Sequence, residues 1–317
     1  MKLIADSLLA ANETLIVAHV SPDGDTLGSA VALYLALKKV GKHSTVAVDG
    51  KIPDKLRLLK RYCFFRREND LVGEKFDCAV AVDVADVSRM GSIKDAFFSA
   101  DVTLNVDHHP TNTKYAERNY VECLSSTGEI ILKLIGELGA SVDENIANAL
   151  YIAISTDTGN FIYSSVTEET LKAAAYLRKC GADIPRLCGM IYAERSLGAT
   201  KLIGRGIDAI ELFCDGKVAA TKLYKKDIDE CGAAKEDTEC MINYAREIKG
   251  VEIAIFVNEQ SGTKAKVGLR SNEYADVAAL ASKFGGGGHV HAAGYTDYGT
   301  MDEIYKRAVE SAVALIK

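Results

Sequence analysis

No two cysteines in this sequence are spaced as C-x-x-C, although eight are scattered along its 317 residues. This spacing argues against a thiolate zinc site, and isolated thiols are typical of the reducing cytoplasm, where we expect the protein to reside. No apolar run approaches the ~18–20 residues of a membrane span. Asp6, Asn12 and Glu13 interrupt the first apolar stretch, which argues against a signal peptide. We therefore expect no membrane association.

An excess of positive charge is also missing, because the formal net charge is −6. A protein that coats long nucleic acid needs many Lys and Arg side chains against phosphates, so this class is disfavoured. The G-K-[ST] ending of a nucleotide P-loop is absent as well. Small anionic substrates remain compatible with the sequence, provided that local cations or metal ions meet them.

The N-terminal part alternates short apolar segments with helical patterns. Strands are predicted at 14–19, 44–49, 76–83 and 102–107, and helices at 26–39, 53–61, 126–138, 144–155 and 168–179. Continuous apolar strands that alternate with helices indicate a parallel sheet with helices on both faces, which is an α/β fold.

The length predicts two domains, because one hydrophobic core seldom extends through 317 residues. We place an α/β domain at 1–185, a helical linker at 186–205 and a smaller α+β domain at 206–317, with the active site in the cleft between the domains. The second domain is predicted from a hairpin at Asp215-Gly216, strands at 251–259 and 264–271, and helices at 237–249 and 274–283.

Acidic and histidine residues follow three of the predicted strands. They are His19, Asp23 and Asp25 after the first, Asp83 at the end of the third, and Asp107, His108 and His109 at the end of the fourth. Ligands bind outside the carboxyl ends of strands in open parallel sheets, so these clusters should converge on one crevice. Any one of these residues alone fits an ordinary helix cap or loop, but three clusters together indicate a site.

Carboxylates with a few imidazoles suit Mn²⁺ or Mg²⁺ better than Zn²⁺. Asp157, in the polar segment STDTGN, is a fourth candidate carboxylate, with a helix C-cap as the alternative. Four crowded carboxylates repel one another, whereas two divalent cations balance their charge. We expect two Mn²⁺ ions, with Mg²⁺ as a substitute.

Four motifs resemble the signature motifs of the DHH phosphoesterase superfamily in family order. They are HVSPDGDTLGS (19–29), AVDVADVSR (81–89), NVDHH (105–109) and ISTDTGNF (154–161). The segments GLRSN (268–272) and DVAALASKFGGGGHVHAAG (276–294) resemble the DHH-associated domain. A single H-x-x-x-D-x-D is weak evidence, but the ordered set together with GGGGH is specific.

The resemblance implies that His19, Asp23 and Asp83 hold one metal ion. Asp25, Asp83, His108 and Asp157 hold the second, so that Asp83 bridges the pair and a water between the metals becomes the nucleophile. Asp107 orients a ligand imidazole, and His109 faces the substrate phosphate.

Further residues are expected to recognise the anionic substrate. The expected groups are Arg89, Arg270, Ser271, Gly285, Gly286, Gly287, Gly288 and His289. The glycines favour a nest of backbone N–H groups for phosphate, with a flexible linker as the alternative. The arginines suit bidentate phosphate binding, with surface salt bridges as the alternative.

Two further features have structural interpretations. The basic stretch Lys55–Arg67 is interpreted as an amphipathic helix packed on the sheet rather than a surface for single-stranded nucleic acid. Gly28 lies inside a predicted helix, where a glycine is unfavourable. Either the backbone approaches the metal-site loop closely at this position, or the helix simply tolerates the glycine. His291 has no assigned role.

The two-domain layout resembles the bifunctional group that cleaves short RNA oligonucleotides and dephosphorylates 3′-phosphoadenosine 5′-phosphate. The expected partners are short single-stranded RNA or DNA and small nucleotide phosphates. A cyclic or linear dinucleotide phosphodiesterase shares every motif used here. A manganese pyrophosphatase or a non-catalytic nucleotide- or RNA-binding module would also account for part of the pattern. A homodimer is compatible with the sequence, which does not specify the oligomeric state.

Overall fold

The computed structural model describes residues 1–316, and the chain divides into two compact units, Met1–Glu194 and a second unit from Arg195 onward. The division falls within the segment 186–205. No helix among residues 1–316 combines the length and the apolar character needed to cross a bilayer.

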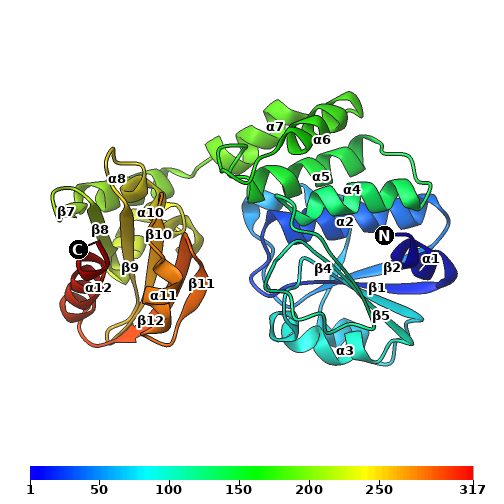
Figure 1. The fold of residues 1–317 in the computed structure, drawn as a ribbon, viewed down its shortest axis with the longest axis horizontal. Coiled ribbons are helices and arrows are strands. Elements are labelled where there is room, and N and C mark those ends of the chain that lie inside the picture. Colours follow the sequence, from blue (N-terminus) through cyan, green and yellow to red (C-terminus); the bar gives the residue numbers. More distant parts are fainter. Residues whose placement is uncertain (317) are drawn as a thin grey trace. The chain divides into compact units, whose positions relative to one another are not determined.

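The first unit is a parallel sheet covered by helices on both faces (Figure 1). Its strands are β1 (Glu13–Ala18), β2 (His43–Val48), β3 (Phe65–Arg66), β4 (Cys78–Val82), β5 (Val102–Asp107) and β6 (Arg118–Val121). Its α-helices are α1 (Lys2–Ala10), α2 (Gly24–Lys39), α3 (Lys94–Phe98), α4 (Thr127–Glu137), α5 (Glu144–Asp157), α6 (Glu168–Lys179) and α7 (Ile184–Cys188). Shorter turns are η1 (Asp54–Leu56), η2 (Leu59–Arg61), η3 (Glu68–Leu71), η4 (Val87–Ile93) and the π-helical η5 (Gly189–Ala193). The α/β prediction is confirmed.

The strand order places the ends of β1 and β4 at the centre of the sheet. The order is β3-β2-β1-β4-β5-β6, and every neighbouring pair is parallel. The chain therefore moves outward in one direction from β1 and in the other direction from β4. Such a reversal opens a crevice at the carboxyl ends of the two central strands.

Alternate residues of β1 divide between two cores, as the pleat of a strand requires. Ile16 and Ala18 are buried with residues of α2, α4 and α5, whereas Leu15 and Val17 are buried with residues of η4 and α3. Figure 1 shows α2, α4 and α5 on one side of this sheet and α3 on the other.

The second unit is a mixed six-stranded sheet with strand order β11-β12-β10-β9-β8-β7. Its strands are β7 (Glu211–Phe213), β8 (Val218–Leu223), β9 (Ile253–Ser261), β10 (Lys264–Ser271), β11 (Gly287–His289) and β12 (Ala292–Tyr298). Its helices are α8 (Leu197–Asp208), α9 (Lys225–Cys231), η6 (Lys235–Thr238), α10 (Met241–Arg246), α11 (Val277–Ser282) and α12 (Met301–Ile316). One core joins the sheet to α11 and α12 and another joins it to α8 and α10. The expected α+β class and the hairpin at Asp215-Gly216 are confirmed.

Two predicted helices are wrong in form. The segment 53–61 forms two 3₁₀ turns, η1 and η2, because Leu56, Leu58 and Leu59 are all buried, and this spacing does not match one face of an α-helix. The segment 237–249 contains only the short helix α10 after the turn η6. The apolar residues of the basic stretch nevertheless pack in the core of the first unit, as expected.

Gly28 allows α2 and α5 to pack closely. A Cβ atom at this position would lie 2.4 Å from the carbonyl oxygen of Ala149 and 2.9 Å from the nitrogen of Ala153. The expectation that the close approach involves the metal-site loop is therefore wrong, since the neighbour is a helix backbone.

Replacing Gly28 by Ala is expected to lower the free energy of unfolding by about 1–3 kcal/mol, because overpacking a rigid contact forces a backbone shift. Urea unfolding of the Gly28→Ala variant measures this change. Gly136→Ala is the matched control, because Gly136 also lies in a helix but has no atom within 4 Å of its Cβ position. The control should be as stable as the parent protein or more stable, and equal stability of both variants would contradict the packing role of Gly28.

Candidate metal centre

Each expected metal ligand lies at the end of a regular element in the first unit. His19 follows β1, Asp83 follows β4, and His108 follows β5. Asp157 is the last residue of α5. Asp23 caps the N-terminus of α2, where its side chain accepts hydrogen bonds from the N–H groups of Asp25 and Thr26. Strand ends, a helix N-terminus and a helix C-terminus therefore supply the candidate ligands.

The candidate ligands form two groups that share Asp83. Nε2 of His19 lies 3.5 Å from Oδ2 of Asp23 and 3.5 Å from Oδ2 of Asp83. Nε2 of His108 lies 3.6 Å from the other carboxylate oxygen of Asp83 and 3.5 Å from Oδ2 of Asp157. The two oxygens of Asp83 thus face different imidazoles, an arrangement that would allow this carboxylate to bridge two cations.

Asp25 completes the second group and is held by the N-terminus of α4. Its Oδ2 accepts a hydrogen bond from the Thr127 N–H (2.7 Å), and its Oδ1 accepts one from the Gly128 N–H (2.9 Å). The side chain of Asp25 is buried, and Nε2 of His108 lies 3.9 Å from Oδ2. The positive end of the helix dipole therefore helps to hold a carboxylate that has little access to water.

The backbone at Asp83 is in the left-handed region, with φ of 63°. A non-glycine residue seldom adopts this conformation, and Asp and Asn do so more readily than most. The N–H group of Asp83 donates to the Val106 carbonyl (3.0 Å), and the Thr127 hydroxyl donates to Oδ1 of Asp83 (2.9 Å). These bonds hold the carboxylate at the centre of the cluster and offset the strain.

The electrostatics of the cluster favour bound cations. Burial raises the pKa of Asp25 well above its usual value, and the charges of Asp83 and Asp157 raise it further. Burial also raises the pKa of Asp157 to about 7, although His108 opposes the change. Burial by itself lowers the pKa of His19, but hydrogen bonds to Asp23 and Asp83 outweigh it and raise the pKa to about 10. Crowded carboxylates thus hold protons when no metal compensates their charge.

The donor set fits a pair of hard divalent cations. In each of the groups His19–Asp23–Asp83 and Asp25–His108–Asp157, the ligand atoms lie within 4.8 Å of one another. Carboxylate oxygens with one imidazole in each group are suitable ligands for Mn²⁺ or Mg²⁺, and neither group contains a cysteine.

Comparison with known proteins identifies the family of this chain. The model of the DHH family, N-terminal domain, matches residues 13–154, and that of the DHHA1 domain matches residues 215–316. A bifunctional oligoribonuclease and PAP phosphatase NrnA of Thermus thermophilus is 31% identical over 98% of this chain and 93% of its own. This chain belongs to the DHH family. A protein of the same name from Bacillus subtilis is 28% identical over 88% of each chain.

A solved structure shows the same fold over nearly the whole chain. The exopolyphosphatase-related protein from Bacteroides fragilis has a TM-score of 0.90 and 26% identity, and the match covers 99% of this chain and 96% of that one. Together with the curated relatives, this likeness identifies the DHH-family chain as a hydrolase of the phosphoesterase class.

The DHH-family motif NVDHH contains a second histidine, His109, which belongs to a partly buried hydrogen-bond network. Nδ1 of His109 lies 2.8 Å from Oδ1 of Asp107, and Oδ2 of Asp107 accepts a hydrogen bond from Asn112 (2.6 Å). Asn112 also donates to Oδ1 of Asn105 (2.8 Å). Burial by itself raises the pKa of Asp107, but the bonds to His109 and Asn112 outweigh it and lower the pKa below its usual value. A charged Asp107 thus orients the His109 ring, whereas Nδ1 of His108 lies 3.1 Å from the Leu124 carbonyl instead.

Asn112 is expected to support catalysis through this network. Replacing it by Ala leaves Asp107 with one donor fewer, so we expect kcat to fall by about 10-fold, within the range for residues that orient metal-site groups. KM should change little, and the pH profile of kcat should shift if His109 titrates in turnover. Asn119→Ala is the matched control, because Asn119 bonds the backbone of Lys114 and Ala116 in the same loop. Equal activity of both variants would contradict this role.

Thr127 and Asn112 were not recognised from the sequence as residues of the site. Ser126 caps α4, so the sequence indicates that a helix starts at Thr127. The contact of Thr127 with Asp25 spans 102 positions, however, and no local pattern predicts it. A polar Ser-Thr-Gly sequence at a helix N-terminus is the only signal, and it is common in proteins that bind nothing there.

Arg89 lies beside the first group of ligands. Its carbonyl accepts a hydrogen bond from the Val20 N–H (2.7 Å), which ties η4 to the loop after β1. The side chain of Arg89 is exposed. Burial by itself raises the pKa of Asp23, but the contacts with His19 outweigh it and lower the pKa, and the charge of Arg89 lowers it further. A guanidinium is therefore available in the region of the carboxylates.

The glycines expected to bind anions in the second unit make hydrogen bonds and close contacts within that unit. The N–H groups of Gly285 and Gly286 donate to the carbonyls of Ser282 and Ala281 at the end of α11. A Cβ at Gly286 would lie 2.3 Å from the Gly294 carbonyl oxygen, and one at Gly288 would lie 2.4 Å from that of Ala292. The glycines thus permit a tight pairing of β11 with β12. The N–H groups of Gly285 and Gly286 are therefore bonded within the protein, so the expected anion nest falls to Gly287 and Gly288.

The remaining candidates of the second unit lie at the adjoining strand ends. Nη1 of Arg270 donates to the Leu269 carbonyl (3.0 Å), and His289 ends β11 with an exposed side chain. The hydroxyl of Ser271 is buried and bonds the Ala275 carbonyl (2.6 Å) and Nδ1 of His291 (2.9 Å). This arrangement makes Ser271 a residue that positions His291, rather than an exposed group for substrate.

Proposed function

We propose that this DHH-family hydrolase cleaves short RNA oligonucleotides to mononucleotides and dephosphorylates 3′-phosphoadenosine 5′-phosphate, with two divalent cations, Mn²⁺ in preference to Mg²⁺. The observation that carries the proposal is the position of Asp83, whose two oxygens face His19 and His108. The names of the relatives from Thermus thermophilus and Bacillus subtilis, bifunctional oligoribonuclease and PAP phosphatase, support the choice of substrates.

The residues of the first unit have distinct roles in this proposal. His19 and Asp23 hold one cation with Asp83, and the second cation is held by Asp83 with the remaining ligands, Asp25, His108 and Asp157. When bound, such a pair of cations supplies an activated water and stabilises charge on the phosphoryl oxygens.

His109 and the arginines act on the substrate itself. His109, which Asp107 orients, faces the scissile phosphate and protonates the leaving oxygen. Arg89 binds a non-bridging phosphate oxygen of the same group, since a guanidinium can donate two parallel hydrogen bonds. Arg270 and His289, with Gly287 and Gly288, bind the terminal phosphate of the substrate, which makes the second unit the substrate-binding domain.

The cysteines are consistent with an enzyme that works in the cytoplasm, where we place it. All eight are unpaired, and burial raises the pKa of both Cys63 and Cys78 to about 12. Such thiols remain protonated and inert in a reducing compartment.

A panel of substrates tests the proposal. Metal-free protein is reconstituted with Mn²⁺, Mg²⁺ or Zn²⁺ and offered dinucleotide and pentanucleotide RNA, 3′-phosphoadenosine 5′-phosphate, cyclic and linear di-adenylate, and pyrophosphate. We expect the highest kcat/KM with Mn²⁺ on the short RNA and the adenosine bisphosphate. A preference for cyclic di-adenylate or pyrophosphate would overturn the substrate assignment, and no turnover with any metal would support a binding protein instead.

A further inference from the structure

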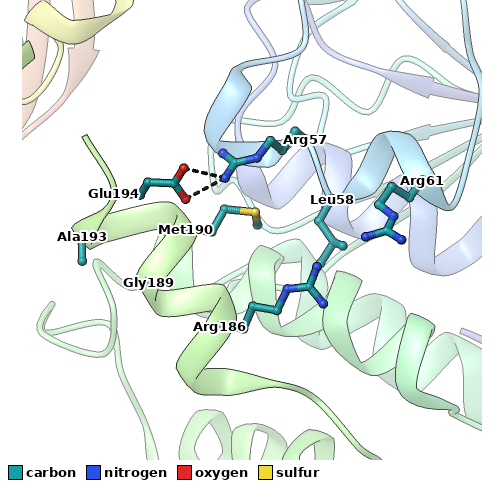
Figure 2. A pocket seen from close by; sticks show the side chains of 8 residues that line it. All are labelled: Arg57, Leu58, Arg61, Arg186, Gly189, Met190, Ala193 and Glu194. Atoms are coloured by element: carbon teal, nitrogen blue, oxygen red, sulfur yellow. Dashed lines mark hydrogen bonds and ion pairs between the residues drawn. The ribbon is translucent and has the colours of Figure 1, made fainter. Parts of the chain in front are cut away.

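The first unit contains a second candidate site that includes none of the proposed metal ligands. A pocket of about 730 Å³ lies between the turns η1–η2 on one side and the α7–η5 segment on the other (Figure 2). Its lining includes Arg57, Leu58, Arg61, Arg186, Met190 and Glu194. A pocket of this volume accommodates a small molecule of nucleotide size.

The pocket is positively charged, although the whole chain has a formal charge of −6. Three arginines and one glutamate line it, which leaves a net charge of +2. Glu194 holds Arg57 through two contacts of 2.8 and 2.6 Å, and Asp54, outside the lining, lies 3.5 Å from Arg57. Arg57 is thus neutralised and fixed in the wall, so the unbalanced charge belongs to the other two arginines.

Arg61 and Arg186 have no ion-pair or hydrogen-bond partner for their guanidinium groups among residues 1–316. Figure 2 shows the two side chains extending from opposite walls toward the space between them. Two guanidinium groups on facing walls suit a phosphate, which accepts several charge-assisted hydrogen bonds at once.

The rest of the lining is apolar. Leu58 is buried, and Met190 is partly buried on η5. A thioether packs well against the edge or face of an aromatic ring, and an apolar wall beside a few polar groups is typical of ligand pockets. The lining therefore suits a molecule with an anionic end and a flat ring.

The pocket walls are connected to elements that carry metal ligands. The hydroxyl of Tyr192, on η5, donates to Oγ of Ser155, on α5 (3.2 Å). Asp157 is the last residue of the same helix. The opposite wall follows β2, which pairs in register with β1 just before His19. A ligand in the pocket thus contacts segments continuous with the candidate metal centre.

We propose that this pocket binds a phosphorylated nucleoside, with the phosphate between Arg61 and Arg186 and the base against Met190 and Leu58. The proposal deepens the proposed function and rests on it for the choice of nucleotides as ligands. The phosphorylated nucleoside is either the distal nucleotide of an oligonucleotide engaged at the metal centre or a free mononucleotide.

The first test locates and measures binding without turnover. Mn²⁺-loaded protein is photolabelled with 8-azido-adenosine 5′-monophosphate, and the labelled peptides are mapped by mass spectrometry. We expect label in the segments 54–61 and 184–194. The variant Arg61→Gln/Arg186→Gln should lose at least about 10-fold in labelling affinity, because two charge-assisted contacts are removed. Lys60→Gln/Lys179→Gln removes the same charge from exposed positions outside the pocket and should label like the parent protein.

The second test distinguishes the two sources of the nucleotide. If the pocket holds the distal nucleotide, the arginine variant should show a KM about 10-fold higher for pentanucleotide RNA, with an unchanged KM for the adenosine bisphosphate. If a free mononucleotide is the ligand, both KM values stay unchanged, and added adenosine 5′-monophosphate is expected to change the rate of the parent protein but not that of the arginine variant.

Two results would overturn the pocket assignment: label that maps only elsewhere, or an arginine variant that labels as well as the lysine control. Pocket labelling in a protein that hydrolyses none of the offered substrates would instead overturn the proposed function alone, because labelling requires no catalysis.

Discussion

Replacing Asp83 by Asn is expected to reduce kcat/KM by at least about 1,000-fold, or about 4 kcal/mol of transition-state stabilisation. The two oxygens of Asp83 face His19 of one ligand group and His108 of the other, so the loss of its charge is expected to weaken the binding of both cations together. Steady-state assays on short RNA, with metal content measured on the same samples, check this result.

The loss should be specific to chemistry rather than folding. Asn has nearly the same volume as Asp and tolerates the left-handed backbone that Asp83 adopts. The variant also removes a charge that raises the pKa of Asp25, so the metal-free variant should be as stable as the parent protein or more stable. Asp86→Asn in the following loop is the control, since Asp86 caps η4 and should be replaceable. Activity of Asp83→Asn at the level of this control would contradict the bridging role.

The metal-free protein is expected to lose stability as the pH rises from ~6 to ~9, by about 1 kcal/mol or more, or about 2–4 °C in Tm for a domain of this size. His19 has a folded pKa of about 10, above its ordinary 6.5, so its stabilisation is complete below pH 6.5 and disappears as the pH rises through about 10. Asp157 has a folded pKa of about 7, above its ordinary 3.8. The destabilisation caused by this shift is therefore absent below pH 3.8, grows as the pH rises, and is complete above about 7. Both groups therefore change stability in the same direction.

Added Mn²⁺ should reverse this dependence, because the metal displaces protons from the same nitrogen and oxygen atoms. We expect the rise in Tm on adding Mn²⁺ to be larger at pH ~8 than at pH ~6. Thermal unfolding in chelator and in Mn²⁺ at both values measures the difference, and Asp83→Asn should show a smaller metal effect. A metal-free Tm that increases between these values would contradict the assignment of His19 and Asp157.

The sequence predicts the candidate metal centre well because its residues follow recognisable local patterns. An apolar run that ends in His19, Asp83 or Asp107 marks the carboxyl end of a strand, and parallel strands bring such ends together. The predicted helix 168–179 and strands 102–107 and 264–271 coincide with α6, β5 and β10 for the same reason, since their periodicity and flanking residues agree.

The sequence predicts poorly whatever depends on a distant partner. The neighbours of Gly28 are 121 and 125 positions away, at Ala149 and Ala153, so the local sequence shows only a glycine in a helix. The glycines at 285–288 have the composition of a loop, yet Gly287 and Gly288 pair with β12 and belong to the sheet. The strands β11 and β12 and the helices α1 and α12 were not predicted.

The close packing of α2, α4 and α5 also bears on which cation the centre accepts. Gly28 and Gly128 allow α2 and α4 to pack closely against α5. Two backbone N–H groups of α4 donate hydrogen bonds to Asp25, and α5 ends at Asp157. Ligands anchored in this way have little room to retreat from a large ion such as Ca²⁺, which needs longer bonds and more oxygens than Mg²⁺. In the proposed centre, glycines outside the ligand set would therefore help to exclude large ions.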